Sequence, residues 1–212
     1  MNKYKIVSLV LAIALLATMA HLVAQHRQSV NAEANGNKAD VVMANILSRK
    51  SVRSYTDEAV SRQQLDTLVK AAMAAPTGKD MRPWKFVVID DKNVMKQLAA
   101  QLPKAKMLTE AQAAVLVCGD LSIKDKDGKS STNWAFDCSA ASENLLLQAE
   151  AMGLGAVWTG VYPYDERMDA IKKVIELPDD IVPFSLIPIG HPKGDPQPKD
   201  KYNKDNIHYN KY

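Results

Sequence analysis

The amino-acid sequence predicts one layered α/β domain, in which helices cover both faces of a β-sheet. Helical and strand patterns alternate along the chain, and this alternation by itself favours parallel strands, although it does not fix strand direction. The chain has 212 residues and a hydrophobic content of 47%. That is enough for one domain with a substantial core.

Each expected element follows from the local sequence. A first helix is expected over Val41–Leu47. The next helix begins with a capping box at Ser61 and Gln64, and it ends at Pro76, whose ring and missing N–H cannot continue a helix. The remaining expected elements, in chain order, are strand Phe86–Ile89, helix Lys92–Leu102, strand Ala113–Val117, helix Asn133–Met152, strand Ala156–Trp158, helix Glu166–Ile175 and strand Phe184–Ile189. A polar tail, Gly190–Tyr212, follows.

The N-terminal residues have the layout of an export segment. The positively charged Met1–Lys5 precedes the apolar run Ile6–Ala20, as in a secretory signal peptide. The run ends short of the roughly 20 apolar residues that a membrane-spanning helix needs. We therefore expect residues 1–32 to be a signal peptide, with an uncleaved membrane anchor as the alternative. Residues 33–39 are then a linker, residues 40–212 form the domain, and the protein is exported, periplasmic or anchored to the cell envelope.

Charge and cysteine content exclude two classes of function. The chain has 27 Lys and Arg against 24 Asp and Glu, but three of the basic residues lie within the first 32 residues. The domain itself is balanced, so no nucleic-acid partner is predicted. The cysteines and the scattered histidines lack the spacing of metal ligands, so no metal site is predicted. Cys118 and Cys138 can form a disulfide or remain as buried free thiols.

Motifs for nucleophilic, zinc or dinucleotide chemistry are not found in the sequence. It contains neither a G-x-S-x-G turn nor an H-E-x-x-H helix. Gly153, Gly155 and Gly160 lack the spacing of a dinucleotide fingerprint, and they stand between a helix and a strand in the reverse order. No essential catalytic acid, base or nucleophile is therefore expected.

A basic segment near the start of the domain is the best candidate for binding. Alternate residues of an extended segment face the same side, so Arg49, Ser51 and Arg53 can point at one ligand. Two guanidinium groups and a hydroxyl suit a phosphate or another oxyanion. A solvated basic stretch explains the same residues equally well. Lys199 and Lys201 form a similar pair in the tail, with solubility as the alternative explanation.

Five segments, in the same order along the chain, resemble the nitroreductase family. They are Arg49-x-Ser51-x-Arg53, similar to the family's opening R-x-S-x-R; Ala75–Trp84, similar to its A-P-S-x-x-N-x-Q-P-W loop; Asp137–Gly155, similar to its D-x(6)-N-L-L-L…G-L-G helix; Trp158-Thr159-Gly160, similar to its W-x-G strand; and Ile189–Pro192 with Lys199-x-Lys201, similar to its I-G-Y-P ending and basic tail. The resemblance covers Ser48–Tyr212.

The resemblance implies a fold, a cofactor and a partner. The fold is a three-layer α+β sandwich with a mixed central sheet, and a C-terminal tail wraps the partner of a homodimer. FMN binds at the interface. Hydride passes in a ping-pong reaction from NAD(P)H, or from an envelope donor, through FMN to a nitroaromatic, a quinone or a similar small acceptor. Membrane contact is expected only through the N-terminal segment.

The same resemblance assigns residues to the phosphate end of FMN. Arg49 and Ser51 would hold the phosphate or the ribityl chain, with Lys50 as a helper. Lys199 and Lys201 would close on the phosphate from the tail.

Other residues would meet the flavin ring. Arg53 would approach its N1/O2 side, where a fixed cation favours the reduced, anionic form. Trp158, Thr159 and Gly160 would lie near the reactive edge, where glycine allows close approach of the backbone. Trp158 is alternatively a core residue.

The chain departs from the family pattern in the loop after the second helix. Asp80 stands where many members have Asn, and Arg82 where many have Gln. A carboxylate accepts a hydrogen bond from flavin N3–H but opposes reduction to an anion, so we expect Arg82 to neutralise it. Two alternatives to a nitroreductase activity remain: another flavin reaction on this fold, such as dehalogenation, azoline oxidation or flavin cleavage, and a non-catalytic flavin- or anion-binding envelope module.

Overall fold

The computed structural model describes residues 18, 19, 21, 22, 25 and 37–212. The chain divides into two compact units, Met1–Ala44 and Asn45–Tyr212. The segment predicted as a signal peptide or anchor lies largely outside the described residues, as does most of the predicted linker. Residues 37–48 are helical, so the first helix starts earlier than expected and includes the end of that linker. None of the helices described is both long enough and apolar enough to cross a membrane.

The second unit contains one five-stranded sheet with the strand order β1–β2–β5–β3, and β4 pairs with β5. The strands are β1 (Trp84–Ile89), β2 (Ala113–Asp120), β3 (Gly155–Ala156), β4 (Thr159–Gly160) and β5 (Ile181–Gly190). Each pairing between these strands is antiparallel. A bridge between Ser51 and Ala156 is parallel.

The parallel strand direction favoured by the alternation of elements is wrong, and the connection between β1 and β2 shows why. Ile89 at the end of β1 pairs with Ala114 at the start of β2. The intervening α3 (Lys92–Gln101) and the 3₁₀ segment η2 (Pro103–Thr109) therefore leave and rejoin the same end of the sheet. A helix between two strands makes a parallel crossover only when it carries the chain back to the opposite end. The α+β class is confirmed.

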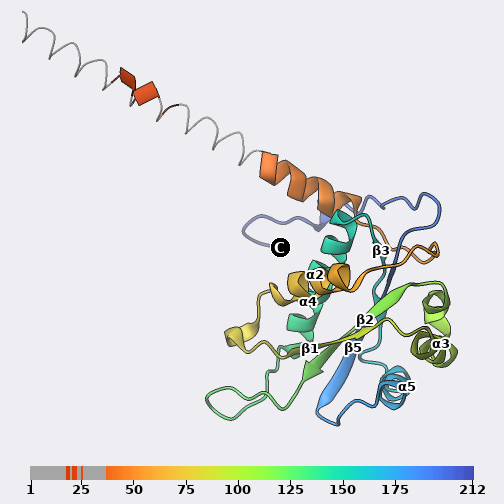
Figure 1. Ribbon diagram of the computed structural model, residues 1–212. Helices are drawn as coiled ribbons and strands as arrows, with labels where there is room; N and C mark the ends of the chain where they lie inside the picture. The colour runs from red at the N-terminus through yellow and green to blue at the C-terminus, as the bar shows by residue number, and fades with distance from the viewer. Residues whose placement is uncertain (1–17, 20, 23–24, 26–36) are drawn as a thin grey trace, which may run out of the picture. The chain divides into compact units, whose positions relative to one another are not determined.

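Helices cover both faces of the sheet, which confirms the three layers (Figure 1). Helices α2 (Arg62–Met73) and α4 (Trp134–Ala151) pack on one face, and α3 and α5 (Asp165–Ile175) pack on the other. The central strand β2 is buried along its whole length. Its alternate residues divide between the two cores: Ala113, Val115 and Val117 belong to the first, and Ala114, Leu116 and Cys118 to the second.

Local signals at the helix ends agree with the structure. The N–H of Gln64 donates to Ser61 Oγ at 3.2 Å, and the N–H of Ser61 donates to Gln64 Oε1 at 2.9 Å, which completes the expected capping box. Gly153 follows α4 with a φ of +70°, a left-handed conformation in which glycine avoids a steric penalty.

The two cysteines are free and buried. The Cys138 thiol donates to the carbonyl oxygen of Cys118 at 3.4 Å. Burial raises the pKa of both thiols to about 12. Of the two alternatives left by the sequence, the free thiols are the ones observed.

Candidate functional site

The basic segment predicted to bind an anion docks against β3. The N–H of Val52 donates to the carbonyl oxygen of Ala156 at 3.0 Å, next to the parallel bridge of Ser51. This approach requires a glycine at residue 155, because a Cβ there would lie 2.7 Å from Cγ1 of Val52. Val52 is buried, whereas Ser51 and Arg53 are exposed. Ser51 and Arg53 therefore face outward, as the extended pattern predicts, whereas Arg49, the third residue of the pattern, is partly buried.

Two cations of this segment are paired with acidic residues of α4. Nε of Arg49 lies 3.5 Å from Oε1 of Glu143, and the Arg49 side chain is 17% exposed. Nζ of Lys50 lies 2.7 Å from Oε1 of Glu150 in a largely buried ion pair. The charge of Lys50 is thus already compensated within the protomer.

A buried tyrosine ties the same segment to β5. The Tyr55 hydroxyl lies 2.7 Å from the carbonyl oxygen of Val52 and 3.2 Å from that of Pro188. Burial raises the pKa of this phenol well above its ordinary value. A Cβ at residue 190 would come within 2.9 Å of the Tyr55 ring, so glycine is needed there for the ring to reach its acceptors.

The start of the C-terminal tail runs beside this segment. The N–H of Thr56 donates to the carbonyl oxygen of His191 at 2.9 Å. Further along, Lys199 and Lys201 are exposed. Arg53 is also exposed, and its Nη1 donates to the carbonyl oxygen of Ser51 at 3.4 Å. The structure thus brings the start of the tail to the basic segment, while its two lysines remain at the surface.

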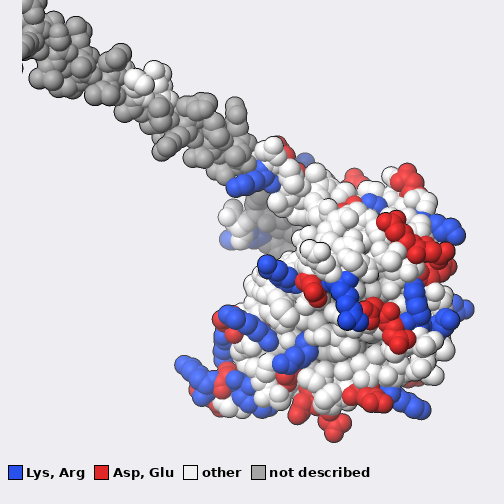
Figure 2. Space-filling view, in the orientation of Figure 1, with Lys and Arg blue, Asp and Glu red and all other residues white. Residues whose placement is uncertain are grey.

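Charge is not concentrated on the visible face of the molecule. Figure 2 shows Lys and Arg side chains interspersed with Asp and Glu. Recognition of an anion therefore depends on a few placed side chains rather than on one extended basic surface.

The loop after α2 contains a second charged pair. Nε and Nη2 of Arg82 donate to the two carboxylate oxygens of Asp80 at 2.7 and 2.6 Å. This bidentate contact holds the pKa of Asp80 below its ordinary value. Both side chains are exposed. The structure therefore joins Asp80 and Arg82 as expected.

The backbone of this loop is held in an unusual conformation. Lys79, Asp80 and Arg82 have φ values of +55°, +53° and +49°, which non-glycine residues rarely adopt. Such conformations persist where the surroundings impose them. Here the N–H of Gly78 donates to Oδ1 of the buried Asp137 at 3.0 Å. Within the part of the chain that is described, Oδ2 of Asp137 has no hydrogen-bond partner.

The two charged regions both contact α4. The N–H of Gly78, at the start of the loop, donates to Asp137 in the first turn of this helix, and Arg49 lies beside Glu143, six residues further along it. These two contacts are therefore about 9 Å apart along the helix axis.

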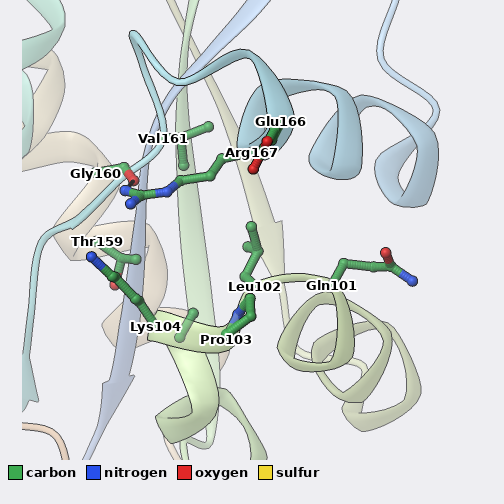
Figure 3. Close-up of a pocket in the computed structure, with 10 residues that line it drawn as sticks. Gln101, Leu102, Pro103, Lys104, Thr159, Gly160, Val161, Glu166 and Arg167 are labelled. Carbon is green, nitrogen blue, oxygen red and sulfur yellow. Dashed lines mark hydrogen bonds between the residues drawn. The ribbon is translucent and has the colours of Figure 1, made fainter.

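A cavity of about 220 Å³ lies beside the third group of predicted residues, Thr159 and Gly160 (Figure 3). It is enclosed by β4, the η2 segment and the first turn of α5. A Cβ at residue 160 would meet no atom within 4 Å, so packing within the protomer does not explain this glycine. Lys104 and Arg167 also line the cavity. Neither residue belongs to a motif, so the sequence alone did not identify them.

Trp158, the remaining predicted residue, is half-buried and packs edge-on against Phe184, with ring centroids 5.5 Å apart. This contact favours its alternative interpretation as a core residue.

The site and the fold together define a class of protein: an α+β sandwich with a docked basic segment and a W-x-G strand. Comparison with known proteins identifies this class. The chain belongs to the nitroreductase family, whose family model matches residues 46–118 and 96–191. It is 37% identical over 198 residues to a candidate NADH dehydrogenase/NAD(P)H nitroreductase from Methanothermobacter thermautotrophicus, over 93% of this chain and 99% of that protein.

Two solved structures show the same fold. A candidate NADH dehydrogenase/NAD(P)H nitroreductase from Bacteroides thetaiotaomicron is 48% identical, with a TM-score of 0.76, over 81% of this chain and 98% of that one. A candidate nitroreductase from Desulfovibrio desulfuricans, solved in complex with FMN, is 26% identical, with a TM-score of 0.67, over 81% of this chain and 97% of that one.

The prediction that the protein is exported, periplasmic or anchored to the envelope is wrong. The archaeal relative aligns over 93% of this chain, a share that cannot be reached without part of residues 1–32. The segment interpreted as an export signal therefore lies partly within the region shared with that relative. A charged start followed by an apolar run is too general a pattern to identify export.

Proposed function

We propose that the protein is an FMN-dependent oxidoreductase of nitroreductase type. It passes electrons from NAD(P)H through FMN to a small acceptor such as a nitroaromatic or a quinone. Family membership supports this function, as do the nicotinamide activities named for the relatives and the FMN bound to the Desulfovibrio structure.

One observation of the structure carries the proposal: the basic segment is docked in the form that binding requires. Val52 is buried against β3, while the side chains of Ser51 and Arg53 are exposed on the same side of the chain. A solvated basic stretch would need neither the bridge to Ala156 nor a glycine at residue 155. This docking supports the assignment of the segment as a binding site.

These residues fit the phosphate end of FMN. Arg49 and Ser51 would bind its oxygens, since a guanidinium group and a hydroxyl are suitable donors to phosphate. Lys50 would act mainly by fixing the segment on α4, because its ammonium is paired with Glu150. Lys199 and Lys201 would reach the phosphate from the tail, of which the start already lies beside this segment.

Other residues of the chain would position the reactive edge of the flavin ring and stabilise its charge. When bound, FMN supplies the hydride and electron transfer. Arg53 would stabilise negative charge on the ring, because its guanidinium is a cation with a planar set of N–H donors. The open space at Gly160 would let the ring edge approach the backbone of β4. Arg167 holds the carbonyl group of Gly160 with a hydrogen bond of 2.7 Å, which keeps the peptide in a fixed orientation.

The functional molecule in this proposal is a homodimer with FMN at the interface. The loop of Asp80 and the segment of Arg53 are both anchored on α4, through Gly78 and through Lys50, and a second copy would cover the exposed side chains of both. Large apolar side chains exposed on the protomer agree with an interface. Ile46, Leu47 and Phe136 are 46%, 66% and 74% exposed.

The proposal is tested by the absorption spectrum and half-reactions of the purified protein. We expect it to take up FMN, to be bleached by NADPH or NADH under nitrogen, and to recover its colour when a quinone or nitroaromatic is added. Arg53→Gln should weaken FMN binding at least tenfold, about the loss of one charge-assisted contact. The matched variant Arg62→Gln removes an exposed arginine of α2, paired with Asp90, and should have no effect. Failure to bind FMN, or bound flavin that neither nucleotide reduces, would contradict the proposal.

A further inference from the structure

The cavity beside Gly160 is lined by two cations, and one of them, Lys104, has no role in the proposed flavin site. Lys104 comes from the η2 segment and Arg167 from the first turn of α5. Figure 3 shows the nitrogen ends of both side chains at the Thr159–Gly160 end of the cavity. The carboxylate of Glu166 lies at the other end, so positive charge is concentrated beside β4.

Arg167 is held rigidly in this position. Its Nη1 donates to the carbonyl oxygen of Gly160 at 2.7 Å, and its Cζ lies 4.0 Å from the centroid of the Tyr164 ring. A guanidinium has five N–H donors in a fixed plane, and this hydrogen bond uses one. Because the side chain is already ordered, a ligand that binds its remaining donors loses less conformational entropy on binding.

Lys104 is placed by the packing of its neighbours. Leu102 and Ala105 are buried on either side of it, which anchors the backbone of η2, while the Lys104 side chain is exposed. Within the described residues, no acidic group lies within ion-pair distance of its ammonium, in contrast with Lys50 and Lys79, which have such partners. Its charge is therefore available to a ligand.

We propose that this cavity recognises an anionic group, a phosphate or a carboxylate, carried by the molecule that exchanges electrons with the flavin. The inference rests on the proposed function, since it takes Gly160 to lie at the reactive edge of FMN. A volume of about 220 Å³ is below the roughly 300 Å³ at which pockets begin to enclose a whole ligand. The cavity therefore holds one end of the substrate, and the remainder extends past Gly160 toward the ring.

The phosphate of a nicotinamide donor and the carboxylate of an acceptor share this chemistry, and separate half-reactions distinguish them. Lys104→Gln is compared with Lys106→Gln, which makes the same change on the same segment but outside the cavity lining. Reduction is followed with NADPH, NADH and benzyl-dihydronicotinamide, which lacks phosphate. Reoxidation is followed with nitrobenzoate and its neutral analogue nitrobenzamide.

We expect Lys104→Gln to raise the concentration required for half-maximal rate by about five- to tenfold for one anionic partner, the usual effect of losing a charged hydrogen bond. Neutral partners, and the Lys106→Gln variant with all partners, should behave as the unmodified protein does. A change with the donors assigns the site to their phosphate, and a change with nitrobenzoate assigns it to the acceptor. Equal behaviour of both variants with both anionic partners overturns the proposal.

Equilibrium binding provides a readout that does not depend on turnover. Calorimetric titration of the oxidised, FMN-loaded protein with ADP-ribose and with benzoate should show at least fivefold weaker binding of one of them to Lys104→Gln than to Lys106→Gln. Identical affinities for both ligands would again overturn the inference. If none of NADPH, NADH and benzyl-dihydronicotinamide bleaches the flavin of the unmodified protein, the proposed function is in error, whatever the titrations show.

Discussion

Replacing Gly155 by alanine tests whether the contact between β3 and Val52 positions the basic segment. The added Cβ would lie 2.7 Å from Cγ1 and 2.8 Å from Cβ of Val52, distances at which carbon atoms overlap. Because Cβ of valine is bonded directly to the backbone, a change of rotamer cannot relieve the overlap, and the segment itself must move. Overpacking of this kind costs about 1–3 kcal/mol of folding free energy.

The displacement has a structural and a functional consequence. It lengthens the hydrogen bond from Val52 to Ala156, which is 3.0 Å in the structure, and it moves Arg49 and Ser51 away from their positions. For a domain of this size, a loss of 1–3 kcal/mol lowers the melting temperature by about 2–12 °C. We also expect FMN to bind at least tenfold more weakly, about the loss of one charge-assisted contact.

The matched control is the same substitution at Gly160, where a Cβ meets no atom within 4 Å of the protomer. Melting is followed by circular dichroism on FMN-free protein, because bound ligand would itself stabilise the fold, and affinity by quenching of FMN fluorescence. Gly160→Ala should melt as the unmodified protein does but should slow reduction of the flavin. A Gly155→Ala protein that melts within about 1 °C of the unmodified one, with unchanged FMN affinity, would refute the reasoning.

Three further predictions follow from the charged and buried groups. Asp80→Asn should raise the flavin midpoint potential, because it leaves the charge of Arg82 uncompensated. Since the ion pair lowers the pKa of Asp80, the difference in potential from the unmodified protein should persist at a pH below the ordinary pKa of a carboxyl group. An unchanged potential in a dye-coupled titration would contradict this prediction. Burial raises the pKa of Cys118 and Cys138 to about 12, so Ellman's reagent at pH 8 should label them only after unfolding, and rapid labelling of the native protein would be the contrary result. Because the pKa of the Tyr55 phenol is raised in the folded protein, the phenol contributes its full stabilisation below the ordinary tyrosine pKa of about 10, and this stabilisation is lost as the pH rises further. Tyr55→Phe should lower the free energy of unfolding in urea by about 1–2 kcal/mol at neutral pH. The same variant should lose less stability at alkaline pH than the unmodified protein does.

The positions of the elements could be predicted from the sequence because their signals are local. The capping box of Ser61 and Gln64 involves atoms within one turn, and the left-handed Gly153 ends α4 without reference to the rest of the chain. Strand direction depends on whether a connection returns to the same end of the sheet. The return through η2 between β1 and β2 has no local signature, and the alternation of elements was therefore misleading.

The same distinction between local signals and tertiary contacts applies to the candidate site. The outward-facing Ser51 and Arg53 follow from the period of an extended segment, and the structure reproduces them. The ion pairs of Arg49 and Lys50 with α4 join residues about a hundred positions apart, so only the tertiary fold reveals them. Arg167 is recognisable as a site residue only because its guanidinium reaches the carbonyl group of Gly160.

The strained loop and the docked segment show how each protomer of the proposed dimer would be prepared for its partner. A twofold axis repeats every contact, so a site that forms where two copies meet occurs twice in the dimer. The loop and the segment of each copy must be ordered before the copies associate, since the entropy lost by ordering them at the interface would weaken association. The buried Asp137 fixes the loop through Gly78, and Tyr55 fixes the segment through Val52. These anchors use groups inside one protomer and leave Asp80 and Arg53 exposed, as a site completed by a second copy requires.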